Sequence, residues 1–319
     1  MHLFFRRLRL ALPLVAAVLG FGAAGPAAAQ ATKIKVVVAP TAFEAVYIAR
    51  DQGIFAKHKL DVEIIPGGPP DAMIPLLLNG QVHYGMSSGL ATVTAISKGL
   101  PVRFALSNLN SGLPSTAALI ASVDGPVKTL ADLKGRKIGL SSLRNQPHLA
   151  LLIAGKAAGL DANAFSFVEI PAAAMVAAAE KGSVDAIYAL DPHKSAAVAS
   201  GKFRVIDESV SKFMGGAPAV TFTAAKEFLD KNPATATAFV AAMTEAFEAA
   251  NKNPEAVREV DAKYTKLPPE FIKGRVIPAF SAVVDQAALK KMTDAMLAQG
   301  WITRDVPAAE MLDANTPRK

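Results

Sequence analysis

The chain repeats its own pattern at a fixed distance, and this repeat limits the possible folds more than any other feature. Lys33-Ile34-Lys35-Val36 opens one half, and Lys137-Ile138-Gly139-Leu140 opens the other. Three residues of the first half recur 102 residues later, with Met73, Gly80 and Val82 answered by Met175, Gly182 and Val184. Self-similarity of this kind predicts two similar structural units in one chain.

Each half reads as strand, helix, strand, helix, strand. The expected helices are Phe43–Lys57 and Asp71–Asn79 in the first half, and Asn145–Ala158 and Ala173–Lys181 in the second. Gly80 and Gly182 follow the second helix of each half, where a left-handed residue commonly ends a helix. Short strands separated by helices favour parallel βαβ units. We therefore predict two α/β lobes.

The last hundred residues have a different pattern. A short strand is expected at 219–223, followed by helices at Lys226–Leu229, Pro233–Lys252, Pro254–Tyr264, Pro268–Val276 and Asp285–Ala298. Asn232 and Asn253 precede first-turn prolines and are expected to cap their helices. Apolar residues at helical spacing, such as Phe239, Met243 and Phe247, predict a face packed on one lobe.

Two facing α/β lobes imply a ligand cleft, because ligands of open parallel sheets bind beyond the carboxyl ends of the strands. The repeat pairs the loops expected there: 41–44 with 141–148, 67–71 with 172–174, and 86–92 with 190–194. Helices that begin at this edge present unpaired backbone N–H groups to a ligand.

One loop supports an enzyme hypothesis. Gly85-Met86-Ser87-Ser88-Gly89 fits the G-x-S-x-G pattern of serine hydrolases, with Ser87 as nucleophile. Such enzymes need a histidine base after the nucleophile, usually late in the chain, and no histidine follows His193. In the alternative that we prefer, the glycines permit a tight turn, and Ser87 or Ser88 caps a helix and donates to a ligand oxygen.

Two further loops carry candidate binding residues. In the first, Ser141 can donate to a ligand, Arg144 can form a forked pair with a carboxylate or sulfonate, and His148 lies in the first turn of a helix. In the second, Asp191 can accept from a ligand N–H or pair with a cation, and His193 can stack or donate. The alternatives are a solvated helix cap for the first loop and an Asp-Pro turn for the second.

Composition excludes several classes of function. The sequence has no cysteine, which excludes disulfides, a catalytic thiol and a cysteine-linked lipid. His148 and His193 lack a nearby carboxylate pair at ligand spacing, and the common nucleotide, zinc and calcium motifs are missing, so we expect neither a metal nor a cofactor. Without three arginines near the start, 31 basic residues face 27 acidic ones, too small an excess to indicate nucleic-acid binding.

The first residues have the layout of a secretory signal peptide. Arg6, Arg7 and Arg9 precede an apolar run of about 15 residues, and the small residues Ala27–Ala29 follow. A retained membrane anchor is the alternative, but a spanning helix needs about 20 apolar residues. We therefore expect a cleaved leader at 1–29 and a mature protein in the bacterial periplasm.

At this point the sequence resembles a known family, the periplasmic solute-binding proteins of ABC importers for nitrate, taurine and aliphatic sulfonates, which includes binders of thiamine-precursor pyrimidines. The resemblance covers essentially the whole mature chain. The segments that carry it are 43–49 (FEAVYIA), 52–55 (QGIF), 60–63 (LDVE), 78–83 (LNGQVH), 129–139 (TLADLKGRKIG), 182–186 (GSVDA) and Asp191-Pro192.

The resemblance implies a type II-like periplasmic binding protein fold, in which two βαβαβ lobes are joined by crossing strands near 117–122 and 218–223 and the helical tail packs on lobe 1. Lobe 1 would comprise 30–118 and 219–319, and lobe 2 would comprise 119–218. Family binding positions carry over to Thr41, Phe43, Ser87, Ser88, Ser141, His148 and Asp191. Leu190 and His193 depart from the aromatic residues that commonly flank the Asp-Pro pair; Arg144 is added from its chemistry alone.

These observations favour a non-enzymatic, monomeric receptor. It would close on a small anion, a sulfonate, a carboxylate or nitrate, and deliver it to an ABC permease in the inner membrane. A binder of thiamine-type pyrimidines or other heteroaromatics is the first alternative, and a hydrolase built on Ser87 is the second. The sequence does not name the ligand.

The first testable prediction concerns processing. The secreted protein should begin at Gln30 or Ala31, because these residues follow the small-residue run after the apolar segment. N-terminal sequencing of the secreted protein measures this directly. Recovery of the full-length chain from salt-washed membranes would contradict it.

Overall fold

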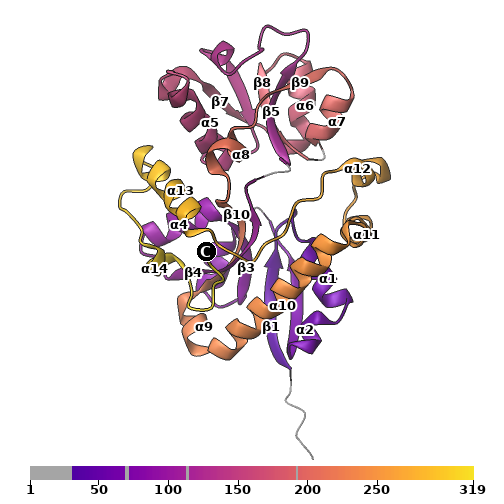
Figure 1. Cartoon of the computed structure of the whole chain (residues 1–319), viewed down its shortest axis with the longest axis vertical. Helices are drawn as coiled ribbons and strands as arrows, with labels where there is room; N and C mark the ends of the chain where they lie inside the picture. The colour runs from indigo at the N-terminus through magenta and orange to yellow at the C-terminus, as the bar shows by residue number, and fades with distance from the viewer. Residues whose placement is uncertain (1–30, 69–71, 113–114, 192) are drawn as a thin grey trace, which may run out of the picture. The chain divides into compact units, whose positions relative to one another are not determined.

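Two five-stranded sheets organise the protein, which the computed structural model describes over residues 31–68, 72–112, 115–191 and 193–319 (Figure 1). The expected signal peptide and its cleavage site lie outside the described residues. Pro192 of the Asp-Pro pair and Asp71 also lie outside them.

Both sheets have the same strand order. The first is β2-β1-β3-β10-β4 and the second is β7-β6-β8-β5-β9. The strands of the first sheet are β1 (Thr32–Val38), β2 (Leu60–Pro66), β3 (Tyr84–Ser88), β4 (Val102–Asn110) and β10 (Pro218–Ala225). Those of the second are β5 (Ala117–Ser122), β6 (Lys137–Leu140), β7 (Ser166–Glu169), β8 (Ala186–Leu190) and β9 (Phe203–Asp207). The predicted pair of similar α/β lobes is therefore confirmed.

The sheets are mixed rather than wholly parallel. In the first, β1 pairs in parallel with β2 and β3, whereas β10 is antiparallel to β3 and β4. In the second, β6 pairs in parallel with β7 and β8, whereas β5 is antiparallel to β8 and β9. The crossing strands expected near 117–122 and 218–223 are present as β5 and β10. They run antiparallel to their neighbours, which the pattern of parallel βαβ units did not predict, because each enters its sheet from the other half of the chain.

Helices connect the parallel strands. The first lobe contains α1 (Glu44–Asp51), α2 (Ile54–Lys57), α3 (Met73–Leu78) and α4 (Gly89–Ser97). The second contains α5 (Gln146–Ala157), α6 (Ala172–Glu180), α7 (His193–Ala199), α8 (Ser209–Met214) and the 3-10 helices η2 (Ala131–Leu133) and η3 (Ala162–Ala164). Gly80 and Gly182 have φ of 70° and 69°, which confirms their predicted helix-ending conformation.

The single helix expected over 43–57 is wrong. The chain is interrupted at Gly53, which has φ of 71° and donates its N–H to the Arg50 carbonyl at 3.1 Å. A left-handed residue bonded back in this way ends α1, and α2 begins at Ile54.

The tail forms α9 (Lys226–Lys231), α10 (Pro233–Lys252), α11 (Pro254–Tyr264), α12 (Pro269–Gly274), α13 (Gln286–Ala298) and α14 (Ala308–Met311). Both α10 and α11 pack on α1, as Figure 1 shows, and the fully buried Phe239 of α10 stacks on Tyr84 at 3.8 Å between ring centroids. This confirms the expected packing of the tail on lobe 1.

The tail also contacts lobe 2. Helix α12 contacts α7, and α13 contacts α5 and α8. Leu289 and Met292 of α13 belong to the same buried cluster as Leu149 and Leu151 of α5. The tail therefore stabilises both lobes and not lobe 1 alone.

The two asparagine caps have different outcomes. The Asn253 side chain accepts from the Ala256 N–H at 3.4 Å, as expected of an N-cap. Asn232 makes no such bond, and its Nδ2 instead donates to the Phe228 carbonyl at 2.8 Å. The same carbonyl also accepts from the Asn232 backbone N–H at 3.0 Å, so Asn232 ends the preceding helix α9 rather than capping α10. Across the described ranges, no helix combines the length and the apolar character needed to cross a membrane.

Truncation of Phe239 should test the attachment of the tail. Phe239→Ala removes a fully buried ring and should lower the free energy of unfolding by about 3–5 kcal/mol. Denaturant unfolding followed by circular dichroism measures the change. Phe213→Ala, at a partly exposed ring of α8, is the control and should cost less. Equal losses in the two variants would mean that the α10 contact adds nothing specific.

Candidate functional site

The candidate binding edge of lobe 1 lies where β1 and β3 end. The G-x-S-x-G segment at the end of β3 has a packing explanation: a Cβ on Gly89 would lie 2.1 Å from the Pro218 carbonyl oxygen. Ser87 is fully buried and its hydroxyl donates to the Ser88 carbonyl at 3.4 Å. Ser88 caps α4, its Oγ accepting from the Ala91 N–H at 3.1 Å. Of the roles predicted for these two serines, the structure shows directly that Ser88 caps a helix.

The loop after β1 places Thr41 on the surface and Phe43 in the core. The Phe43 ring packs edge-to-face on Tyr47 at 5.5 Å. Between them, Ala42 has φ of 58°, and its carbonyl accepts from Asn108 Nδ2 at 2.8 Å. Asn108 is fully buried, and sequence reasoning missed it. Its signal is the polar pair Ser107-Asn108, which directly follows the apolar run Phe104–Leu106 in β4.

Glu44, the first residue of α1, does not present a free charge to this edge. Its buried carboxylate forms a 2.8 Å ion pair with Arg275, which also pairs with Asp261 at 2.7 Å. Burial and the adjacent Glu44 carboxylate raise the pKa of Asp261 to about 7, although Arg275 acts in the opposite direction. Arg275 therefore offsets the Glu44 charge, and it shares its guanidinium with Asp261.

In lobe 2, the loop after β6 holds Arg144 against the tail. Arg144 donates its backbone N–H to His148 Nδ1 at 2.9 Å, and its guanidinium donates to the Trp301 carbonyl at 3.2 Å. The guanidinium also lies 5.5 Å from the centroid of the Trp301 ring. Ser141 lies in the same loop and its Oγ accepts from Asn145 Nδ2 at 3.4 Å. Within this loop, the structure brings Ser141, Arg144 and His148 together.

His148 is packed between aromatic rings, at 4.2 Å from Phe167 and 5.1 Å from Trp301. Burial, and secondarily the Arg144 charge, lower the pKa of His148 to about 4. The imidazole is therefore neutral near pH 7. Because Nδ1 accepts from the Arg144 N–H, we assign the proton to Nε2, which can donate to a ligand.

Sequence reasoning also missed Gln146, the first residue of α5. Its Oε1 accepts from the Ser111 hydroxyl at 2.8 Å, and Ser111 lies in the connection between the two sheets. A polar residue at the start of a helix is common, so nothing in the sequence indicated a hydrogen bond between Gln146 and Ser111.

After β8, Asp191 is held by the protein itself. Its carboxylate accepts from the Ser195 N–H at 3.0 Å and pairs with Lys194 at 3.1 Å. The cation-pairing alternative for Asp191 is thus observed. His193, partly exposed, packs edge-to-face on Phe271 of α12 at 6.3 Å.

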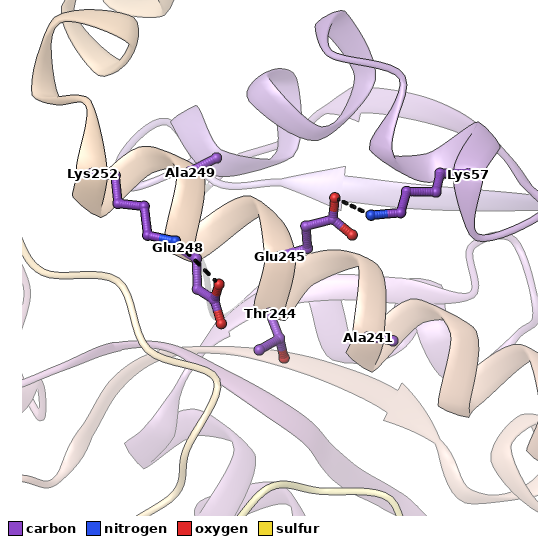
Figure 2. A pocket seen from close by; sticks show the side chains of 7 residues that line it. All are labelled: Lys57, Ala241, Thr244, Glu245, Glu248, Ala249 and Lys252. Atoms are coloured by element: carbon purple, nitrogen blue, oxygen red, sulfur yellow. Dashed lines mark hydrogen bonds and ion pairs between the residues drawn. The ribbon is translucent and has the colours of Figure 1, made fainter.

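Two hollows lie on the described surface. Figure 2 shows one on α10 and α2, where Lys57 pairs with Glu245 at 2.8 Å and Lys252 with Glu248 at 3.7 Å. Lys57 precedes β2 and is therefore at the opposite edge of the sheet from the candidate loops. Because the charged side chains that line this hollow pair with one another, we interpret it as ordinary solvated surface.

The second hollow is a groove of about 480 Å³ beside Arg144. The first turn of α3 and the length of α4 from Leu90 to its C-cap residue Lys98 form one wall, and Leu143 and Trp301 form the other. Arg144 and Lys98 bring positive charge to this otherwise largely apolar surface. In the ranges that the structure describes, no three or more metal-binding side chains gather at a common point.

Comparison with known proteins agrees with the fold. The family model described as NMT1/THI5 like matches residues 41–257. An aliphatic sulfonates-binding protein of Escherichia coli is 27% identical over 192 residues, which cover 60% of this chain and 58% of that protein. The taurine-binding periplasmic protein of E. coli is 27% identical over 231 residues, covering 71% and 69%. The first match therefore spans less than two thirds of that relative.

Among solved structures, the periplasmic aliphatic sulphonate binding protein SsuA from E. coli has a TM-score of 0.75 with 20% identity. The match covers 89% of this chain and 98% of that one, and it concerns the fold. These relatives are transport binding proteins and not enzymes, which leaves the serine hydrolase alternative without support.

The only tryptophan of the sequence, Trp301, can report on His148. Protonated imidazole quenches indole emission, so fluorescence should fall with a midpoint near pH 4, well below the ordinary histidine value of about 6.5. The folded state resists this proton, so the contribution of His148 to stability should be lost as pH falls from about 6.5 to 4. It is measured as the difference between the parent protein and His148→Gln, because Asp261, whose pKa is raised to about 7, acts in the opposite direction over this range in both proteins. A fluorescence titration and pH-dependent denaturation measure the two effects.

His148→Gln should abolish the emission change, whereas His83→Gln, remote from Trp301 in lobe 1, should retain it. A midpoint near 6.5, or a transition that persists in His148→Gln, would contradict the assignment.

Proposed function

This chain belongs to the NMT1/THI5 like family, and we propose on that premise that it is the periplasmic substrate-binding protein of an ABC importer. It captures a small organic anion, a sulfonate or a carboxylate, between the binding edges of its lobes. It then delivers the anion to a membrane permease. The names of the sulfonate- and taurine-binding relatives support this ligand class.

The balance of charge at the binding edges carries the proposal. Glu44 is held by Arg275, and Asp191 by Lys194. Glu169 accepts weakly from the Leu143 N–H at 3.4 Å. In contrast, no carboxylate of the described residues lies within ion-pair distance of the Arg144 guanidinium, whose recorded partners are the Trp301 carbonyl and ring. A cation without an acidic partner favours an anionic ligand.

Local backbone structure supports the same sign of charge. Helices α4 and α5 begin at the binding edges, and their first N–H groups carry partial positive charge. Neutral His148 adds the Nε2–H hydrogen-bond donor and brings no negative charge that would repel an anion. The largely apolar groove beside Arg144 would suit the organic part of the anion.

A thermal-shift panel tests the ligand class. The compounds would be taurine, methanesulfonate, short carboxylates, nitrate and an aminopyrimidine related to thiamine. A ligand at a hundred times its dissociation constant should add about 2.7 kcal/mol to the stability of the folded protein. A sulfonate or carboxylate should produce the largest shift. If the aminopyrimidine does so instead, the heteroaromatic alternative replaces the anion.

The Arg144→Ala variant tests whether Arg144 binds the anion. It should weaken binding of the best anion by about 1.5–3 kcal/mol, the range for hydrogen bonds to charged groups, as measured by calorimetry. Arg136→Ala is the matched control, because Arg136 pairs with Asp185 at 2.9 Å at the amino end of β6, away from the binding edge. Unchanged affinity in Arg144→Ala would disprove its role.

A further inference from the structure

The C-terminal segment 265–285 connects the binding edges of both sheets. At one end Arg275 pairs with Glu44, the first residue of the helix that follows β1. At the other, Phe271 of α12 contacts His193, the first residue of the helix that follows β8. A segment that reaches both edges borders the space between them.

Buried charges fix the position of this segment. Arg275 is 13% exposed, and the carboxylates of Glu44 and Asp261 are each 1% exposed. Charges desolvated to this degree are retained only in close, hydrogen-bonded pairs, so Arg275 has little freedom to move. Helix α12 ends one residue before Arg275 and is therefore held at the same place.

The sheet order shows where the Phe271–His193 pair lies relative to a ligand. In the second sheet β6 lies between β7 and β8. The connection from β6 leads to β7 on one side, and the connection from β7 leads to β8 on the other side of β6. Ligands of such sheets bind in the crevice between the loops that follow these two strands. Arg144 is in the loop after β6, and His193 follows β8.

We propose that Phe271 and His193 form an aromatic wall of the ligand pocket and select ligands that carry a flat ring. Both residues are partly exposed, and their rings meet edge-to-face at 6.3 Å with an interplanar angle of 68°. This geometry leaves ring surface available for stacking by a third ring. The inference rests on the proposed binding function and adds a preference for the organic part of the ligand, whereas Arg144 addresses its charge.

A set of four compounds separates the two roles. Benzenesulfonate and methanesulfonate are anions with and without a ring; benzylamine and methylamine are the corresponding cations. The parent protein should bind the ring compound about tenfold more tightly than its ringless counterpart within whichever charge class it binds. Phe271→Leu, which keeps apolar volume, should reduce that ratio to about one, and Phe271→Tyr should retain it. Calorimetry and competition measure these ratios.

Phe228→Leu is the matched control. Phe228 also packs on a histidine, His83, at 4.9 Å, but His83 precedes β3 and lies at the opposite edge of lobe 1. This variant should keep the ring preference. If the parent protein binds the cations at least as tightly as the anions but still prefers the ring compounds, the anion assignment alone is refuted. If the parent protein binds no ring compound more tightly than its ringless counterpart, or if Phe271→Leu keeps the ratio, the aromatic wall is wrong.

Discussion

Each sheet of this protein is completed by a strand that arrives from the other half of the chain. Strand β10 is inserted between β3 and β4, and β5 between β8 and β9. The first residues of both strands meet the carboxyl ends of their antiparallel neighbours β3 and β8: Val220 pairs with Ser88, and Ala117 with Leu190. Because the carboxyl ends are also where ligands of parallel sheets bind, the crossings and the candidate binding loops are brought to the same edges.

Charge at these edges is governed by ion pairs within the protein, one of them between distant parts of the sequence. Glu44 is neutralised by Arg275, which is 231 residues away, while Asp191 is neutralised by its neighbour Lys194. The Arg144 guanidinium instead contacts a carbonyl and a ring of the tail. Glu44 and Asp191 are therefore each paired with a cation of the protein, and Arg144 remains able to bind an anion.

The C-terminal helices are part of the candidate site as well as of the core. Phe239 anchors α10 to the first sheet, and α13 shares a buried cluster with α5 of the second. Two aromatic residues of the tail, Trp301 and Phe271, contact His148 and His193, each at the start of a lobe 2 helix. Packing of the tail on both lobes thus places aromatic rings beside both candidate loops.

The sequence by itself determined the features that depend on near neighbours. The repeat predicted two α/β lobes, and helical spacing with first-turn prolines predicted α10 and α11 to the residue, because periodicity and capping act within a few positions. Only the tertiary structure decided that Ser87 is buried, that Arg275 holds Glu44 and that Phe271 meets His193. These depend on which distant segments pack together, and a side chain's accessibility and partner are set by that packing rather than by its local motif.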